Sequence, residues 1–94
     1  MARVIIPKNS WVDIKALLSL SDDIKYSTSN EGNSVLQVIT TLDTGVEPVA
    51  EPYSLGIKQY ATGNIGSYWD HSAALGKGIW VYSHGLEGQL EVQI

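Results

Sequence analysis

The sequence predicts an all-β fold: one small antiparallel β-sandwich or barrel with at most one short helical turn, spanning residues 1–94 as a single domain. Short runs rich in β-branched and aromatic residues recur along the chain, and turn residues separate them at short intervals. Seven of the nine glycines lie between Gly56 and Gly88, a density typical of turns and close backbone approaches. The chain of 94 residues has no cysteine, so packing or self-association must stabilise it.

The first strands are expected close to the N-terminus. The run RVIIP (3–7) is typical of a short strand that a proline ends. The next segment, Ser10–Ile14, suits a strand followed by a short helical turn. A longer helix is the alternative, because Ser10 with Asp13 resembles a capping box and the following apolar residues have helical spacing.

The middle of the chain is predicted to form a hairpin. One arm is Ile24–Thr28, the other is Ser34–Leu42, and the intervening Asn-Glu-Gly-Asn provides the turn. In the second arm, Leu36, Val38 and Leu42 form the more apolar face, which we expect to point into the core.

The second half of the sequence is predicted to contain the remaining strands. A loop with two prolines covers 43–52, and glycine-punctuated, irregular strands are expected at 53–63 and 64–72. Ile79–His84 and Gln89–Ile94 are predicted to pair as a second hairpin around a Gly-Leu-Glu-Gly turn. Both faces of the first arm are apolar, so this strand is expected to be central in its sheet or to meet a partner with one face.

Composition and charge argue against several classes of protein. The absence of cysteine excludes disulfides and thiolate metal sites. The net charge is −4 and the few basic residues are dispersed, so nucleic-acid binding has little electrostatic basis. The N-terminal apolar run is too short for a signal peptide, and no stretch is long enough to span a membrane. We therefore expect a chain that is made in a cytoplasm and used without general secretory export, and that needs no cofactor.

The sharpest enzymatic pattern is the Asp-Thr-Gly at 43–45, which follows an apolar strand. It resembles the active-site turn of retroviral-type aspartic proteases, which are homodimers with one catalytic aspartate from each subunit. The resemblance implies that Asp43 is catalytic and shares one proton with its copy, while Thr44 and Gly45 hold the turn. The residues that follow depart from the family's pattern, and turn chemistry alone also favours Asp-Thr-Gly after a strand.

Two histidines and a carboxylate form a weak metal-site pattern. Asp70 lies next to His71, and His84 follows later in the chain. Adjacent residues on a strand point to opposite faces, so Asp70 and His71 would not converge on one ion. No metal site is predicted.

Four aromatic residues make up the candidate interaction surface: Tyr68, Trp69, Trp80 and Tyr82. Exposed aromatic side chains can anchor a protein interface or stack on a sugar. The competing interpretation is that Trp69 belongs to the core and the tyrosines are half-buried. A carbohydrate-binding β-domain that acts through Trp69 or Trp80 is thus a further alternative.

Two long segments near the ends of the chain carry a family resemblance. They are IIPKNSWVDIKALLSL (5–20) and GIWVYSHGLEGQLEVQI (78–94), and a hairpin, an acidic proline-containing loop and a glycine-rich stretch lie between them. In this order they resemble small accessory virion proteins of tailed bacteriophages. The chain departs from that pattern at 57–74, where it is longer.

The resemblance implies a non-enzymatic structural protein located in the virion: a capsid decoration protein, a head-fibre base, or a neck or tail subunit. Its partners would be copies of itself, with a trimer favoured, and the major capsid, portal or tail proteins. A β-domain with a thin core would gain stability by burying apolar surface against such partners. The final strand, with Leu90, Val92 and Ile94 on one face, is expected to be a sheet edge that a neighbouring subunit covers.

Overall fold

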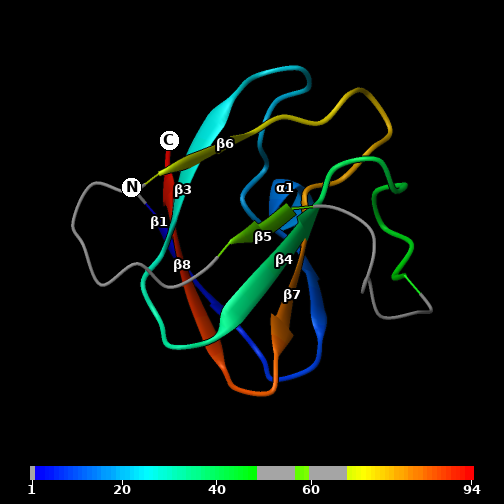
Figure 1. The fold of residues 1–94 in the computed structure, drawn as a ribbon. Helices are drawn as coiled ribbons and strands as arrows, with labels where there is room; N and C mark the ends of the chain where they lie inside the picture. The colour runs from blue at the N-terminus through cyan, green and yellow to red at the C-terminus, as the bar shows by residue number, and fades with distance from the viewer. Residues whose placement is uncertain (1, 49–56, 60–67) are drawn as a thin grey trace.

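Two four-stranded antiparallel sheets make up the fold in the computed structural model, which describes residues 2–48, 57–59 and 68–94 (Figure 1). The first sheet contains, in order, β1 (Ala2–Ile6), β8 (Gly88–Gln93), β3 (Tyr26–Asn30) and β6 (Trp69–His71). The second contains β2 (Trp11–Asp13), β7 (Trp80–His84), β4 (Val35–Ile39) and β5 (Ile57–Gln59). One helical turn, α1 (Ile14–Leu17), follows β2. The predicted all-β fold is confirmed, and the two separate sheets identify it as a sandwich.

The core lies between the two sheets. Alternation along β8 turns Leu90 and Val92 inward, and alternation along β4 does the same for Leu36 and Val38. The buried apolar cluster comprises Val4, Ile6, Ile14, Leu20, Leu36, Val38, Ala73, Ile79, Val81, Leu90 and Val92. Burial of these side chains is the main favourable term that holds the sheets together.

The central strands are β7 and β8. The strand β7 lies between β2 and β4, which confirms the prediction that the doubly apolar segment is central. The strand β8 lies between β1 and β3, with Val92 opposite both Ala2 and Thr28. The expectation of an unprotected edge at the final strand is therefore wrong, and the first sheet has its edges at β1 and β6.

Both predicted hairpins are wrong in their pairing. The strands β3 and β4 lie in different sheets, and so do β7 and β8. Each short turn carries the chain across the core, so that β4 pairs with β7 and β3 pairs with β8. Turn residues specify where the chain reverses, but they do not specify whether the next strand pairs with its predecessor or packs across from it.

Buried polar side chains hold these two crossings together. The Asn30 amide donates to the carbonyl of Ser34 at 2.7 Å and accepts from the amide of Gly32 at 3.2 Å. The hydroxyls of Ser34 and Ser83 lie 2.5 Å apart, and Ser83 also donates to the carbonyl of Leu86. Backbone groups that a paired hairpin would satisfy are thus satisfied by side chains.

The strand and helical turn predicted after residue 10 are confirmed as β2 and α1. The helix cap is Asp13 rather than Ser10, because its carboxylate accepts from the amides of Lys15 and Ala16. Of the irregular strands predicted at 53–63 and 64–72, β5 and β6 are described; the other positions, except Tyr68 and Ser72, lie outside the described residues.

Candidate functional site

An aromatic cluster lies on the outer face of the second sheet. Trp11 and Trp80 meet edge to face with ring centroids 6.4 Å apart, Trp11 and Tyr82 lie 5.2 Å apart, and Tyr82 and His84 lie 4.9 Å apart. Alternation along β7 places Trp80, Tyr82 and His84 on one face, and β2 brings Trp11 opposite Tyr82. We call these four residues the aromatic cluster.

The aromatic cluster is closely packed within the chain. Gln37 and Ile39 of β4 lie opposite Tyr82 and Trp80, and both are buried. Trp80 is 5% exposed and Tyr82 is 3% exposed. These two predicted interface residues therefore present little surface to a partner in the free chain.

The structure does not bring the four predicted site residues together. Tyr68 and Trp69 lie at β6 in the first sheet, whereas Trp80 and Tyr82 lie on β7 in the second. Trp69 is half-buried opposite Thr28, and Tyr68 is exposed. The interface role of the four stays a prediction. Trp11, which the prediction omitted, could have been found from the alternation of β2 once its pairing with β7 was known.

The Asp-Thr-Gly turn is tied to the loop before β7. The Asp43 carboxylate lies 2.6 Å from the ammonium of Lys77. The backbone carbonyl of Asp43 accepts from the indole of Trp80 at 2.9 Å. The amide of Thr44 donates to the carbonyl of Gly76 at 3.0 Å. The side chain of Asp43 is 67% exposed, so this carboxylate forms a surface ion pair.

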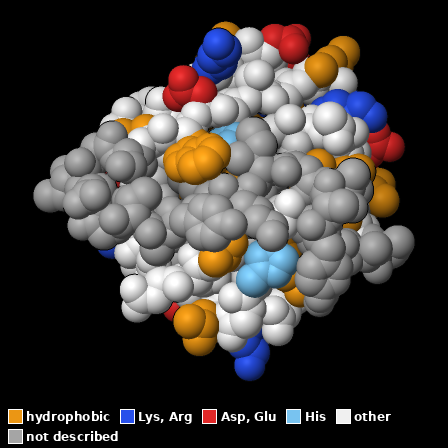
Figure 2. Space-filling model, in the orientation of Figure 1, with side chains coloured by type: hydrophobic (Ala, Val, Ile, Leu, Met, Phe, Trp, Pro, Cys, Tyr) orange, Lys and Arg blue, Asp and Glu red, His pale blue; other side chains and the backbone are white. Residues whose placement is uncertain are grey.

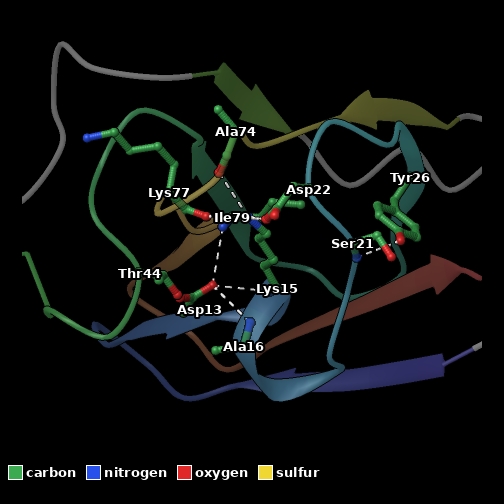
Figure 3. A network of polar contacts seen from close by, with 10 residues as sticks. All are labelled: Asp13, Lys15, Ala16, Ser21, Asp22, Tyr26, Thr44, Ala74, Lys77 and Ile79. Atoms are coloured by element: carbon green, nitrogen blue, oxygen red, sulfur yellow. Dashed lines mark hydrogen bonds and ion pairs between the residues drawn. The ribbon is translucent and has the colours of Figure 1, made fainter.

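Asp13 is the centre of a polar network that the sequence pattern did not single out (Figure 3). Its Oδ1 atom accepts from the amides of Lys15 at 3.1 Å, Ala16 at 3.3 Å and Ile79 at 3.2 Å. Its Oδ2 atom accepts from the hydroxyl of Thr44 at 2.6 Å. One carboxylate thus joins the start of α1, the Asp-Thr-Gly turn and the start of β7.

A buried lysine completes this network (Figure 3). Lys15 is 7% exposed, and its ammonium donates to the carbonyls of Ala74 at 3.0 Å and Lys77 at 2.8 Å. The same ammonium forms an ion pair with Asp22 at 2.5 Å. Its three donors are therefore matched by three acceptors, which is how a buried ammonium avoids a large desolvation cost.

The charged and hydrogen-bonding groups of this network have their partners within the chain itself. In residues 2–48, 57–59 and 68–94, no buried side-chain nitrogen or oxygen lacks a partner. Within the same residues, no group of three or more His, Asp or Glu side chains is placed to hold a metal ion.

The described part of the chain has no helix long and apolar enough to cross a membrane.

The strand β6 carries a buried histidine. His71 lies opposite Tyr26 and is 4% exposed. Burial lowers the pKa of its imidazole below the ordinary value of 6.5, and the charge of Asp70 opposes that shift. Asp70 itself points to the outer face, where it accepts from the hydroxyl of Ser27 at 2.7 Å.

Among the described residues, Figure 2 shows no single dominant patch on the face that it draws. Hydrophobic side chains appear there in several separate groups, and charged side chains lie mainly near the margin.

The chain matches no protein-family model, curated protein or solved structure in the comparisons with known proteins.

Proposed function

We propose that this chain is a non-enzymatic structural subunit of a bacteriophage virion, which assembles with copies of itself and binds capsid, portal or tail proteins. One observation carries the proposal. The two segments that resemble phage accessory proteins, 5–20 and 78–94, pair with each other: Ile5 and Ile6, at the end of β1, pair with β8, and β2 pairs with β7. Segments far apart in the sequence therefore form one structural unit, as expected when both belong to the pattern of a single fold.

The Asp13 network supports a binding role over a catalytic one. A subunit that acts by binding needs a rigid surface more than it needs reactive groups. Thr44 is bonded to Asp13, Asp43 is paired with Lys77, and Trp80 donates to the backbone of Asp43. These contacts give the Asp-Thr-Gly turn a structural use, which is the role we propose for it.

The test is whether the chain is a stoichiometric part of particles. Particles would be purified by density gradient from lysates of cells that express the gene, and peptides of this chain would be quantified against the major capsid protein. We expect a fixed ratio across the particle peak. A chain that stays in the soluble fraction, at the level of an abundant host protein used as a carry-over control, would overturn the proposal.

The Asp43→Asn variant separates the structural proposal from the protease alternative. A structural subunit should enter particles equally well with either side chain, since the substitution keeps the backbone carbonyl that accepts from the indole of Trp80. A protease would instead lose peptide cleavage, because its dyad needs two carboxyl groups. Cleavage by the wild type that disappears in this variant would favour the protease.

A further inference from the structure

We propose that β1 is the surface through which two copies of this chain associate, by antiparallel pairing of β1 with β1. This deepens the self-association in the proposed function and rests on it. β1 is an edge of the first sheet, and no strand among the described residues pairs with its outer side. It has five residues and no proline, whereas the other edges, β6, β2 and β5, have three residues each. Among the strands that the structure describes, β1 therefore offers the longest free row of backbone donors and acceptors.

The sequence of β1 fits its own copy in one register. With Val4 opposite Val4, Arg3 lies opposite Ile5 of the second copy and Ala2 lies opposite Ile6. The inward residues Val4 and Ile6 then stay on the core side in both copies. A register centred on Arg3 would oppose two like charges, and one centred on Ile5 would bring in Pro7, which has no amide hydrogen.

The outer face of the joined sheets is also complementary. Arg3 already forms an ion pair with Glu91 of β8 at 3.2 Å, and its side chain is 55% exposed. Ile5 is 47% exposed on the same face, next to Gln89. In the proposed register the aliphatic part of Arg3 covers Ile5 of the other copy. No two like charges lie directly opposite each other across the junction, and the two Arg3 side chains, which are diagonal neighbours, each have a Glu91 of their own copy as partner.

Pairing of this kind has two-fold symmetry. It joins two sheets into one of eight strands, with β1 and its copy at the centre and β6 at each outer edge. The product is a dimer, so the trimer favoured from the sequence would need another surface. On a particle, such dimers would be the unit that docks.

Two substitutions at Ile5 test the register with opposite signs. Ile5→Glu places a carboxylate opposite Arg3 of the other copy, and Ile5→Lys places an ammonium there. We expect Ile5→Glu to tighten dimerisation and Ile5→Lys to weaken it, each by roughly tenfold in Kd. The effect is this large because the two-fold symmetry of the dimer creates two contacts between residue 5 of one copy and Arg3 of the other. Overall charge predicts the reverse order, since Ile5→Lys makes this acidic chain less negative and Ile5→Glu makes it more negative. Gln89→Lys, on the neighbouring strand and the same face, is the matched control and should leave Kd nearly unchanged.

Sedimentation equilibrium over a wide concentration range gives the masses and Kd values. A wild type that stays monomeric would overturn β1 pairing while leaving particle binding open. A trimer, or an oligomer whose Kd is the same in both Ile5 variants, would also overturn it and would move self-association to another surface. Should either variant fail to fold, hydrogen exchange on the wild type decides. The outward β1 amides gain protection with rising concentration if the proposal is right, and stay unprotected if it is wrong.

Discussion

At the scale of single residues, the absence of a side chain at Gly78 is what permits the Asp13 network. A Cβ atom at Gly78 would lie 2.5 Å from Oδ2 of Asp13 and 2.7 Å from its Cγ. The Asp13 carboxylate cannot easily move away, because four donors hold it. The backbone at Gly78 and the carboxylate of Asp13 are therefore fitted to each other.

We predict that Gly78→Ala destabilises the protein by about 1–3 kcal/mol, because the added methyl group displaces the Asp13 carboxylate from its donors. Asp13→Ala should cost a similar amount, about 1–3 kcal/mol, since it removes the helix cap and leaves amides unpaired. In the double variant the collision no longer exists, so its cost should fall below the sum of the two. Urea unfolding followed by tryptophan fluorescence measures all three. Strictly additive costs would show that Gly78 and Asp13 are not coupled.

His71 is predicted to make stability fall in weak acid. Its pKa in the folded chain is below the ordinary value of 6.5, so the unfolded chain binds the proton more readily. The free energy of unfolding should therefore be highest above about pH 6.5 and decrease as the pH falls below it. His71→Gln should flatten this decrease in urea titrations between about pH 7.5 and about pH 5.5. Asp70→Asn should steepen it, because the Asp70 charge raises the pKa of His71. Equal slopes in wild type and His71→Gln would contradict the assignment.

At the scale of elements, the pattern of alternating residues predicts strands well and their partners poorly. The strand predicted over Ser34–Leu42 is observed as Val35–Ile39, and Leu36 and Val38 lie in the core as alternation predicted, whereas Leu42 lies beyond the strand and is half-buried. The partners of that strand are β7 and β5 rather than β3, and no local signal indicates this. Pairing depends on how both sheets bury their inner faces at once, which is a property of the whole chain.

The candidate site shows the same limit. The aromatic types at Trp80 and Tyr82 were visible in the sequence, but their burial against Gln37 and Ile39 depends on β4 lying beside β7. Asp13 could be read as part of a capping pattern, whereas its bond to Thr44 joins segments that the sequence cannot place together. Local chemistry was therefore predictable, and long-range neighbours were not.

At the scale of the whole molecule, the two ends of the described chain lie side by side (Figure 1). Ala2 pairs with Val92, so β1 and β8 form the sheet's most distant pairing in sequence while being direct neighbours in space. Bringing such distant segments together is a slow step in folding, because the loop entropy is lost before the contacts form. The turn between β7 and β8 is in the opposite situation: it joins neighbours in sequence that do not pair.

A circular permutant uses both properties. We predict that joining Ile94 to Met1 through two glycines, and opening the chain between Leu86 and Glu87, gives a folded protein that folds faster than the natural order. The join makes β8 and β1 a hairpin with a short loop, which lowers the mean sequence separation of contacts, and the opening falls in an exposed turn. Ser83 and Leu86 stay on the same side of the opening, and the hydroxyl of Ser83 then donates to the new terminal carboxylate of Leu86 in place of its carbonyl.

The matched control has the same joined ends but opens between Gly32 and Asn33. That opening places Asn30 and Ser34 at opposite ends of the chain. In the natural order the side-chain amide of Asn30 donates to the carbonyl of Ser34 at 2.7 Å, and this hydrogen bond is buried. We expect the control to be less stable than the first permutant, because a buried bond then has to form between two chain ends. Stopped-flow refolding and urea unfolding measure both proteins. A permutant opened after Leu86 that folds more slowly than the natural chain would show that β1–β8 pairing does not limit folding. Equal stability of the two permutants would show that the hydrogen bond between Asn30 and Ser34 contributes little to the free energy of unfolding.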